Sequence, residues 1–357
     1  MPLNNSLKLD TIELLKALIA IPSFSKEENK TAELMSSFFT KKSIPINRRN
    51  NNVWVKSKYW NPAMPTILLN SHHDTVKPVA GWQRNPFEPK IEDEVLYGLG
   101  SNDAGASLVS LAAIFMHFYE YKNLPFYLIF LASAEEEISG KQGVESVLGD
   151  LGKIDFGIVG EPTQMQMAIS EKGLLVIDGV AEGKAGHAAR AEGKNAIYVA
   201  LKDIDFLQNF RFEKISDQLG AVKISVTQIK AGTQHNVVPD QCQFVIDVRT
   251  TEHYSNKVVF DFLQKETQSK LTARSFRLNS SGIPRSHPIV KVGESLGLSS
   301  YGSATLSDQA LMPFPTLKIG PGNSNRSHTA DEFIVLEEIK NGIDIYCQLL
   351  EGLIIHH

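Results

Sequence analysis

The sequence predicts an α/β protein whose main domain has a mixed sheet and carries an inserted α+β domain. In both outer parts of the chain, short apolar runs typical of buried strands alternate with longer segments of helical periodicity. The middle of the chain instead has the order β-α-β-β-α-β, which is typical of a split βαβ, or ferredoxin-like, sandwich. A length of 357 residues also exceeds what one hydrophobic core usually supports. We therefore expect 1–173 and 280–357 to form one domain and 174–279 to form a second.

Periodicity and helix signals define the elements of the main domain. Helical periodicity over Leu9–Ile21 stops before Pro22, because proline disfavours a helical conformation in the residue before it. Ser25 and Glu28 have the spacing of a capping box and predict a second helix that runs to Lys41. The other expected elements are strands over 52–58, 66–71, 125–133, 156–159 and 315–319, and helices over 104–121 and 336–353.

Alternating apolar residues and amphipathic stretches define the inserted domain. Its expected strands cover 174–181, 221–230, 243–248 and 271–278, and its expected helices cover 195–210 and 256–270. The order of these six elements is what favours the split βαβ sandwich.

Composition excludes several classes of function. A net charge of −4 provides no basic surface for nucleic acid or for an anionic membrane. No apolar stretch is long enough to span a membrane, and the first apolar segment is interrupted by Glu13 and Lys16, unlike a signal peptide. Cys242 and Cys347 are far apart in the sequence and lack metal-type spacing. We therefore expect a cytoplasmic protein with reduced thiols.

Polar clusters follow the predicted strands at the points where the strands end. His72 and Asp74 follow the apolar run over 66–70, and on an extended backbone their side chains project to the same side. A neutral imidazole is a good zinc ligand, and a neighbouring carboxylate can fix its tautomer. A strand-end histidine that is merely satisfied by its neighbour is an equally good interpretation of this stretch alone.

Acidic residues recur at the other strand ends and at one helix start. Glu135, Glu136 and Glu137 follow an apolar strand, Glu161 follows another, and Asp103 precedes a long apolar helix whose dipole would favour its ionised form. Burying several carboxylates together is costly unless a cation neutralises them. A metal centre would solve that problem.

With these clusters assembled, the chain resembles the zinc-dependent amidohydrolases and peptidases of the family that includes acetylornithine deacetylase, succinyl-diaminopimelate desuccinylase, aminoacylase and glutamate carboxypeptidase. The resemblance covers nearly the whole chain, and five motifs occur in the family's order. These are Ser71-His72-His73-Asp74-Thr75-Val76, Gly98-Leu99-Gly100-Ser101-Asn102-Asp103, Glu135-Glu136-Glu137-Ile138-Ser139-Gly140, Gly160-Glu161-Pro162-Thr163, and His328 followed by Asp331 and Glu332. Leu99 stands where the family usually has arginine, and Ser71 where it has glycine.

The resemblance implies two zinc ions in each subunit, with cobalt or manganese as open alternatives. It implies that His72 and Glu161 bind one ion, that Glu137 and His328 bind the other, and that Asp103 bridges both. Asp74 would orient His72, and Glu136 would be the general base. The triplet leaves a second register open, in which Glu135 and Glu136 supply base and ligand; Gly140 and Gly143 favour the first register.

The resemblance also assigns the inserted domain as a lid and as the surface of a homodimer. Gly186-His187-Ala188-Ala189-Arg190 is similar to the motif that supplies an oxyanion-binding histidine, often to the partner subunit. Asn236 and Arg249 lie in segments similar to those that bind the substrate carboxylate, a group that guanidinium binds bidentately. The glycine-rich loop with Gly320 and Gly322 is a further expected substrate contact.

The function expected from this resemblance is hydrolysis of the amide bond of a small N-acyl amino acid, with N2-acetylornithine, an intermediate of arginine biosynthesis, as the first candidate substrate. N-acetylcitrulline, N-succinylornithine, succinyl-diaminopimelate and dipeptides are the alternatives. A non-catalytic binding relative is a further hypothesis, which the intact set of base and ligands disfavours.

Overall fold

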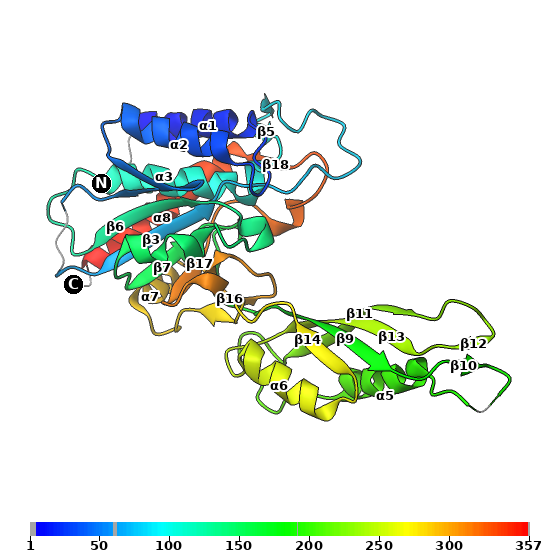
Figure 1. Cartoon of the computed structure of the whole chain (residues 1–357). Coiled ribbons are helices and arrows are strands. Elements are labelled where there is room, and N and C mark those ends of the chain that lie inside the picture. Colours follow the sequence, from blue (N-terminus) through cyan, green and yellow to red (C-terminus); the bar gives the residue numbers. More distant parts are fainter. Residues whose placement is uncertain (1–4, 60–62, 191, 356–357) are drawn as a thin grey trace. The chain divides into compact units, whose positions relative to one another are not determined.

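The computed structural model describes residues 5–59, 63–190 and 192–355, and the chain divides into two compact units (Figure 1). The first unit comprises Met1–Ile169, Gly282–Tyr301 and Ser307–His357, and the second comprises Ser170–Ser281 and Gly302–Leu306. The two units have separate hydrophobic cores.

A nine-stranded sheet forms the centre of the first unit. Its strand order is β1-β2-β6-β3-β7-β17-β8-β15, with β16 paired to β8. The inner strands β6, β3, β7 and β17 run parallel, and β3 and β6 are buried along their whole length. The bounds are β1 (Ile46–Arg49), β2 (Asn52–Lys56), β3 (Thr66–His72), β6 (Tyr127–Ser133), β7 (Phe156–Val159), β8 (Met167–Glu171), β15 (Ser281–Gly282), β16 (Ser300–Ser303) and β17 (Thr316–Lys318).

Helices cover the sheet, and alternate side chains of β3 reach opposite faces. Ile67 and Leu69 pack in the large core cluster that includes side chains of α1, α2, α3, α7 and α8, while Leu68 packs in a second cluster with Ile129 and Leu151. The helices are α1 (Asn5–Ile19), α2 (Asn29–Lys41), α3 (Ala106–Phe118), α4 (Leu148–Leu151), α7 (Pro288–Ser295) and α8 (Leu336–Ile355). A three-stranded sheet that the sequence did not predict is formed by β4 (Lys90–Glu92), β5 (Val95–Tyr97) and β18 (Phe333–Val335).

The second unit is the predicted split βαβ sandwich. Its antiparallel sheet has the order β11-β13-β9-β14, with a separate two-stranded ribbon of β10 and β12. The elements are β9 (Leu175–Glu182), β10 (Gly186–His187), α5 (Ala196–Asn209), β11 (Lys223–Ala231), β12 (Val237–Val238), β13 (Gln241–Arg249), α6 (Asn256–Glu266) and β14 (Lys270–Ala273). The helix expected over 256–270 is shorter, because Thr267 is its extended C-cap residue and Lys270 already pairs with Val180 in β14.

The predicted capping box of the second helix is wrong. The helix begins at Asn29, and its N-cap residue Glu28 makes no capping bond with its side chain. The Ser25 hydroxyl instead donates to Asp74 at 2.7 Å, and the Glu28 carboxylate accepts from Asn51. Both side chains are therefore used for contacts that are distant in the sequence.

Candidate metal centre

His72 and Asp74 lie where β3 ends, at the carboxyl edge of the parallel strands. The His72 ring is buried, and its Nδ1 lies 3.0 Å from the carbonyl oxygen of Asp74 and 3.5 Å from Asp74 Oδ1. His73 projects to the other side, where its Nδ1 lies 2.9 Å from Thr31 Oγ1. The contacts at Nδ1 of His72 leave Nε2 directed at the acidic residues around it.

Three carboxylates from three different segments surround His72 Nε2. Asp103 Oδ1 lies at 3.3 Å, Glu161 Oε1 at 3.8 Å and Glu136 Oε2 at 3.9 Å. On the far side of Asp103, His328 Nε2 lies 3.7 Å from Asp103 Oδ2. Asp103 thus lies between two histidines and presents one oxygen to each.

The same geometry separates the members of the glutamate triplet. Glu137 Oε2 lies 3.0 Å from His328 Nε2, and Glu136 faces His72. The Glu135 carboxylate instead accepts from the backbone N–H of Gln142, in the loop that follows. The structure therefore brings Glu136 and Glu137 into the histidine cluster and turns Glu135 away from it.

The Asp74 carboxylate connects β3 to the turn that carries Glu136 and Glu137. Its Oδ1 accepts from the backbone N–H of Glu136 at 3.0 Å, and its Oδ2 accepts from the N–H of Glu137 at 3.2 Å and from the Ser25 hydroxyl. One buried side chain therefore fixes both the imidazole of His72 and the backbone that aims the two glutamates.

Replacing Asp74 with asparagine is expected to weaken metal affinity or kcat/KM by about 10- to 100-fold, the usual cost of losing an outer partner of a metal-binding group. The amide nitrogen of asparagine would face an N–H donor where a carboxylate oxygen now accepts. Metal titration and steady-state kinetics measure the effect. Ser25→Ala is the matched control, because it removes only one donor to Asp74 and should lower metal affinity and kcat/KM less than Asp74→Asn does. Wild-type metal affinity and activity in Asp74→Asn would contradict this role of Asp74.

Burial and mutual proximity shift the pKa values of this cluster. Burial raises the pKa of Glu161 to about 8 and that of Glu136 well above its ordinary value. Burial opposes the charged form of His72, yet the charge of Glu136 and the hydrogen bond with Asp103 raise the pKa of this imidazole. The hydrogen bond with Glu137 raises the pKa of His328 to about 9. The raised pKa values of Glu136 and Glu161 favour their protonated forms, and those of His72 and His328 favour the cationic imidazoles.

The donor atoms fit a divalent cation. Those of His72, Asp103 and Glu137 lie within 4.8 Å of one another, as do those of His72, Glu136 and Glu161. Imidazole nitrogen and carboxylate oxygen are ligands that zinc, cobalt and manganese accept. A cation here would also replace the protons that burial favours on Glu136 and Glu161.

The family model for peptidase family M20/M25/M40 matches residues 68–352. The chain belongs to this family. An uncharacterized metallohydrolase of Methanocaldococcus jannaschii is 29% identical over 300 residues, which cover 81% of this chain and 83% of the relative. The acetylornithine deacetylase of Buchnera aphidicola is 26% identical, over 96% of this chain and 97% of the relative. A dinuclear metal-binding peptidase of Bacillus subtilis has the same fold, with a TM-score of 0.74 and 18% identity over 99% of both chains.

Membership makes the protein a metal-dependent hydrolase that acts on amide bonds. The family match confirms the resemblance that the motifs indicated, and the shared fold confirms the predicted fold class. The particular metal, substrate and residue roles belong to the proposals below.

Near the candidate metal centre lie two buried acids, Glu332 and Asp308, to which the sequence analysis gave no role. Glu332 accepts from the backbone N–H groups of Gly100, Asn102 and Asp103, at 3.1, 2.8 and 2.9 Å. The helix dipole was expected to favour the ionised form of Asp103, and this expectation is wrong. Helix α3 begins only at Ala106, and Asp103 has a non-helical conformation. The only sequence signal for Glu332 was its position shortly after His328.

Asp308 is the second such acid, and it lies near the ends of β3 and β6. Its Oδ2 accepts from the Ser133 hydroxyl at 2.6 Å and from the Asn70 amide at 2.9 Å. Burial raises the pKa of Asp308 to about 6. No local pattern could have placed it here, because both partners are more than a hundred residues away in the sequence.

The predicted glycines of the last loop contact protein. Gly320 and Gly322 are buried, and a Cβ atom at Gly320 would lie 2.5 Å from the carbonyl oxygen of Glu161. Gly322 has a φ of +93°, and its Cβ would lie 2.4 Å from Asn102 Oδ1. These contacts hold the loop against the segments that carry Glu161 and Asp103, and contact with a substrate stays a prediction.

The second unit brings two of its three predicted site residues together. His187 in β10 pairs with Val237 in β12, and Asn236 accepts from the N–H of Ala188 through its carbonyl oxygen. His187 and Asn236 are both exposed. Arg249 lies at the opposite end of β13, where Asp247 holds its guanidinium with two hydrogen bonds of 2.8 and 3.1 Å.

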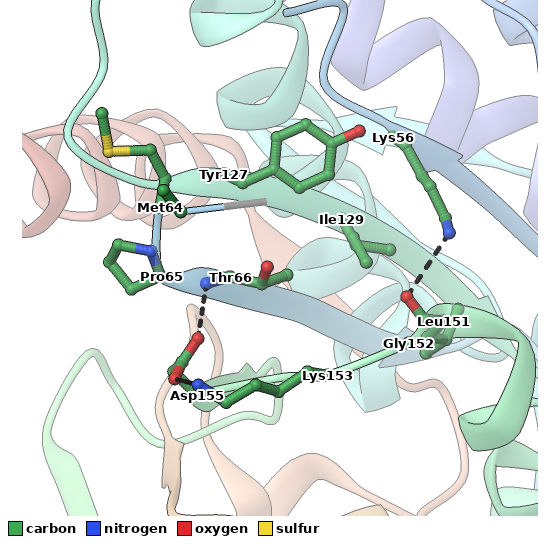
Figure 2. Close-up of a pocket in the computed structure, with 11 residues that line it drawn as sticks. Lys56, Met64, Pro65, Thr66, Tyr127, Ile129, Leu151, Gly152, Lys153 and Asp155 are labelled. Atoms are coloured by element: carbon green, nitrogen blue, oxygen red, sulfur yellow. Dashed lines mark hydrogen bonds and ion pairs between the residues drawn. The ribbon is translucent and has the colours of Figure 1, made fainter. Parts of the chain in front are cut away.

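A cavity of about 690 Å³ opens at the amino ends of the parallel strands of the main sheet (Figure 2). It lies beside Thr66 and Tyr127, the first residues of β3 and β6, whereas the histidine cluster lies where β3 ends. Its charged groups are engaged with protein, because Lys153 pairs with Asp155, and Lys56 lies 3.4 Å from the Leu151 carbonyl oxygen. We therefore place the chemistry at the carboxyl ends of the strands.

Among the described helices, none has the length and apolar character needed to cross a bilayer.

Proposed function

We propose that the protein is a two-zinc amide hydrolase that removes the acyl group from a small N-acyl amino acid, with N2-acetylornithine of arginine biosynthesis as the first candidate. The observation that carries this proposal is the position of Asp103, with one oxygen 3.3 Å from His72 and the other 3.7 Å from His328. A carboxylate between two histidines is suited to bridging two cations. The free thiols of Cys242 and Cys347 support a location in the reducing cytoplasm.

In the proposed centre, His72 and Glu161 hold one zinc ion, Glu137 and His328 hold the other, and Asp103 contacts both. Cobalt and manganese accept the same nitrogen and oxygen donors and remain alternatives. When bound, two such ions supply Lewis acidity for the amide carbonyl and make a water molecule more acidic. Asp74 keeps the His72 ring in the orientation that directs Nε2 to the centre.

Glu136 is proposed as the general base. It lies within the cluster, and its raised pKa suits a group that takes a proton from the attacking water and then gives it to the departing amine nitrogen. His187 is proposed to stabilise the oxyanion that forms on the amide carbonyl oxygen. Its imidazole is exposed and can donate a hydrogen bond to that negative charge.

The second unit is proposed to pair two copies of the chain into a homodimer. Arg249 lies at the end of β13 where the chain enters and leaves the second unit, since the next residue, Thr250, pairs with Gly173. His187 lies beyond the other end of β13, which spans roughly 26 Å at ~3.3 Å per residue. One small substrate cannot contact both residues of one rigid lid. If both act on it, His187 comes from the partner subunit.

Mixing two inactive variants tests this arrangement. His187→Ala and Glu136→Gln chains, each inactive alone, are expected to recover about a quarter of wild-type activity after random exchange, because half of the dimers are mixed and each has one complete site. Activity is measured after exchange is verified with differently tagged chains. No recovery in verified mixed dimers would place His187 in its own subunit's site or outside catalysis.

A carboxylate-bearing substrate is supported by Arg249 and by the deacetylase among the relatives. The guanidinium is now held by Asp247, so a substrate carboxylate would have to compete with that side chain or be bound beside it. N-acetylcitrulline, N-succinylornithine, succinyl-diaminopimelate and dipeptides present a carboxylate as well and remain the alternative substrates.

Amine release from a panel of N-acetyl and N-succinyl amino acids and dipeptides tests the proposal, with zinc-loaded protein and again after chelation. Chelator-sensitive release from N2-acetylornithine alone is the expected result. Release from another member would keep the mechanism and replace the substrate. Release that persists after complete removal of metal would overturn the role of the ions.

A further inference from the structure

A second group of metal-ligating side chains lies between α3 and α8. Atoms of His117 on α3 and of Cys347 and Glu351 on α8 that could each act as a ligand all lie within 4.8 Å of one another. The two α8 residues are spaced i, i+4, which puts them on one face of that helix. Helices α3 and α8 pack against each other (Figure 1). Tyr121 adds a hydroxyl 3.4 Å from His117 Nε2.

This group is separate from the candidate metal centre. α3 starts just after Gly105, close to Asp103, and His117 is near its other end. At ~1.5 Å per residue, His117 lies roughly 18 Å from Gly105 along the helix axis. The two sets of side chains therefore cannot share an ion.

The donor set has the composition of a zinc ligand set. A thiolate, an imidazole and a carboxylate together carry two negative charges, which match one divalent cation, and thiolate selects borderline and soft metals over magnesium or calcium. Burial lowers the pKa of His117, so its ring is neutral near pH 7 and has a nitrogen lone pair for a cation. Cys347 is buried, while His117 and Glu351 are only partly buried, so an ion could arrive from the solvent side.

We propose that His117, Cys347 and Glu351 bind a further divalent cation of the zinc type, which links α3 to α8. The fourth position of a tetrahedral site would be filled by water or by the Tyr121 hydroxyl. Binding replaces the thiol proton of Cys347, which leaves to the buffer as the sulfur–metal bond forms. This site does not depend on the proposed amide substrate or on the ions of the candidate metal centre.

Cobalt substitution tests the proposal, because only a thiolate ligand gives Co²⁺ an intense sulfur-to-metal absorption in the near ultraviolet. The candidate metal centre has nitrogen and oxygen ligands alone. The full chain loaded with Co²⁺ is expected to show this absorption, Cys347→Ser to lose it, and Cys242→Ser to keep it. Cys242 is the matched control, since it is buried in the core of the second unit. Absence of the absorption in the wild-type chain, or its loss in Cys242→Ser, would overturn the proposal.

Metal content provides the second measurement. After equilibration with Zn²⁺, the wild-type chain is expected to hold one more equivalent than Cys347→Ser, whatever the occupancy of the candidate metal centre. If Cys347→Ser does not fold, Glu351→Gln takes its place, because Glu351 is partly exposed. This variant is expected to lose the same equivalent of zinc. Equal zinc content in the wild-type chain and in a folded variant would contradict the site, and unchanged hydrolysis is expected in each variant.

Discussion

Glu136→Gln is expected to lower kcat by at least about 10²- to 10⁴-fold, the usual contribution of a positioned general acid–base group. Glutamine has nearly the shape of glutamate but cannot take up the proton of the attacking water. Because Glu136 is not assigned as a ligand, metal content should stay at the wild-type value. Single-turnover kinetics and metal analysis of the same preparation measure both quantities.

Glu135→Gln is the matched control for this experiment. It makes the same chemical change one residue earlier, at a side chain that contacts the backbone of Gln142 instead of the histidines. It should retain most of the activity. Loss of a metal ion in Glu136→Gln would make that residue a ligand, and inactivation by Glu135→Gln with retained metal would move the base to Glu135.

Glu332→Ala is expected to destabilise the fold and to weaken metal binding together. The substitution leaves two buried backbone N–H groups and one partly buried N–H group without an acceptor, at a cost of about 1–3 kcal/mol for each buried group. Two of these belong to Asn102 and Asp103, so the turn that aims the Asp103 carboxylate loses its support. Denaturant unfolding of the metal-free protein and metal titration measure the two effects.

Two further variants separate support of Asp103 from general stability. Glu332→Gln keeps one acceptor oxygen, which can serve Asn102 and Asp103 while the contact with Gly100 is lost, so metal affinity should recover more than stability does. Asp331→Ala removes an acceptor of two less buried N–H groups in another loop and should leave metal affinity unchanged. Wild-type metal affinity in a destabilised Glu332→Ala would show that Glu332 supports the fold alone.

Much of the fold could be predicted because apolar runs of strand length are strong local signals. The strands that carry His72 and precede Glu136 are buried throughout, and such runs need no distant partner to be recognised. The prediction of a capping box was wrong because contacts distant in the sequence overrode a local signal. Ser25 and Glu28 have correct local spacing, but Asp74 and Asn51 bind their side chains from elsewhere in the chain.

Residues of the candidate metal centre could be predicted where they lie at a strand end or in a recognisable motif. A residue that acts only through contacts distant in the sequence could not be predicted. The positions of Asp103, Glu161 and His328 came from motifs, whereas Asp308 has only nonlocal partners and no motif. The ribbon of β10 and β12 was also missed, because strands of two residues carry no periodicity.

The pairing of β14 with β9 places the last strand of the second unit beside its first. Ala273 lies opposite Ile177, and the Ser280 hydroxyl donates to the carbonyl oxygen of Glu171, so the two ends of the segment Ser170–Ser281 are close together. An insertion with neighbouring ends can be replaced by another of different sequence or size without rerouting the chain that holds the histidines and acids. In evolutionary terms, the second unit can diverge at a different rate from the unit that holds the histidines and acids of the candidate metal centre.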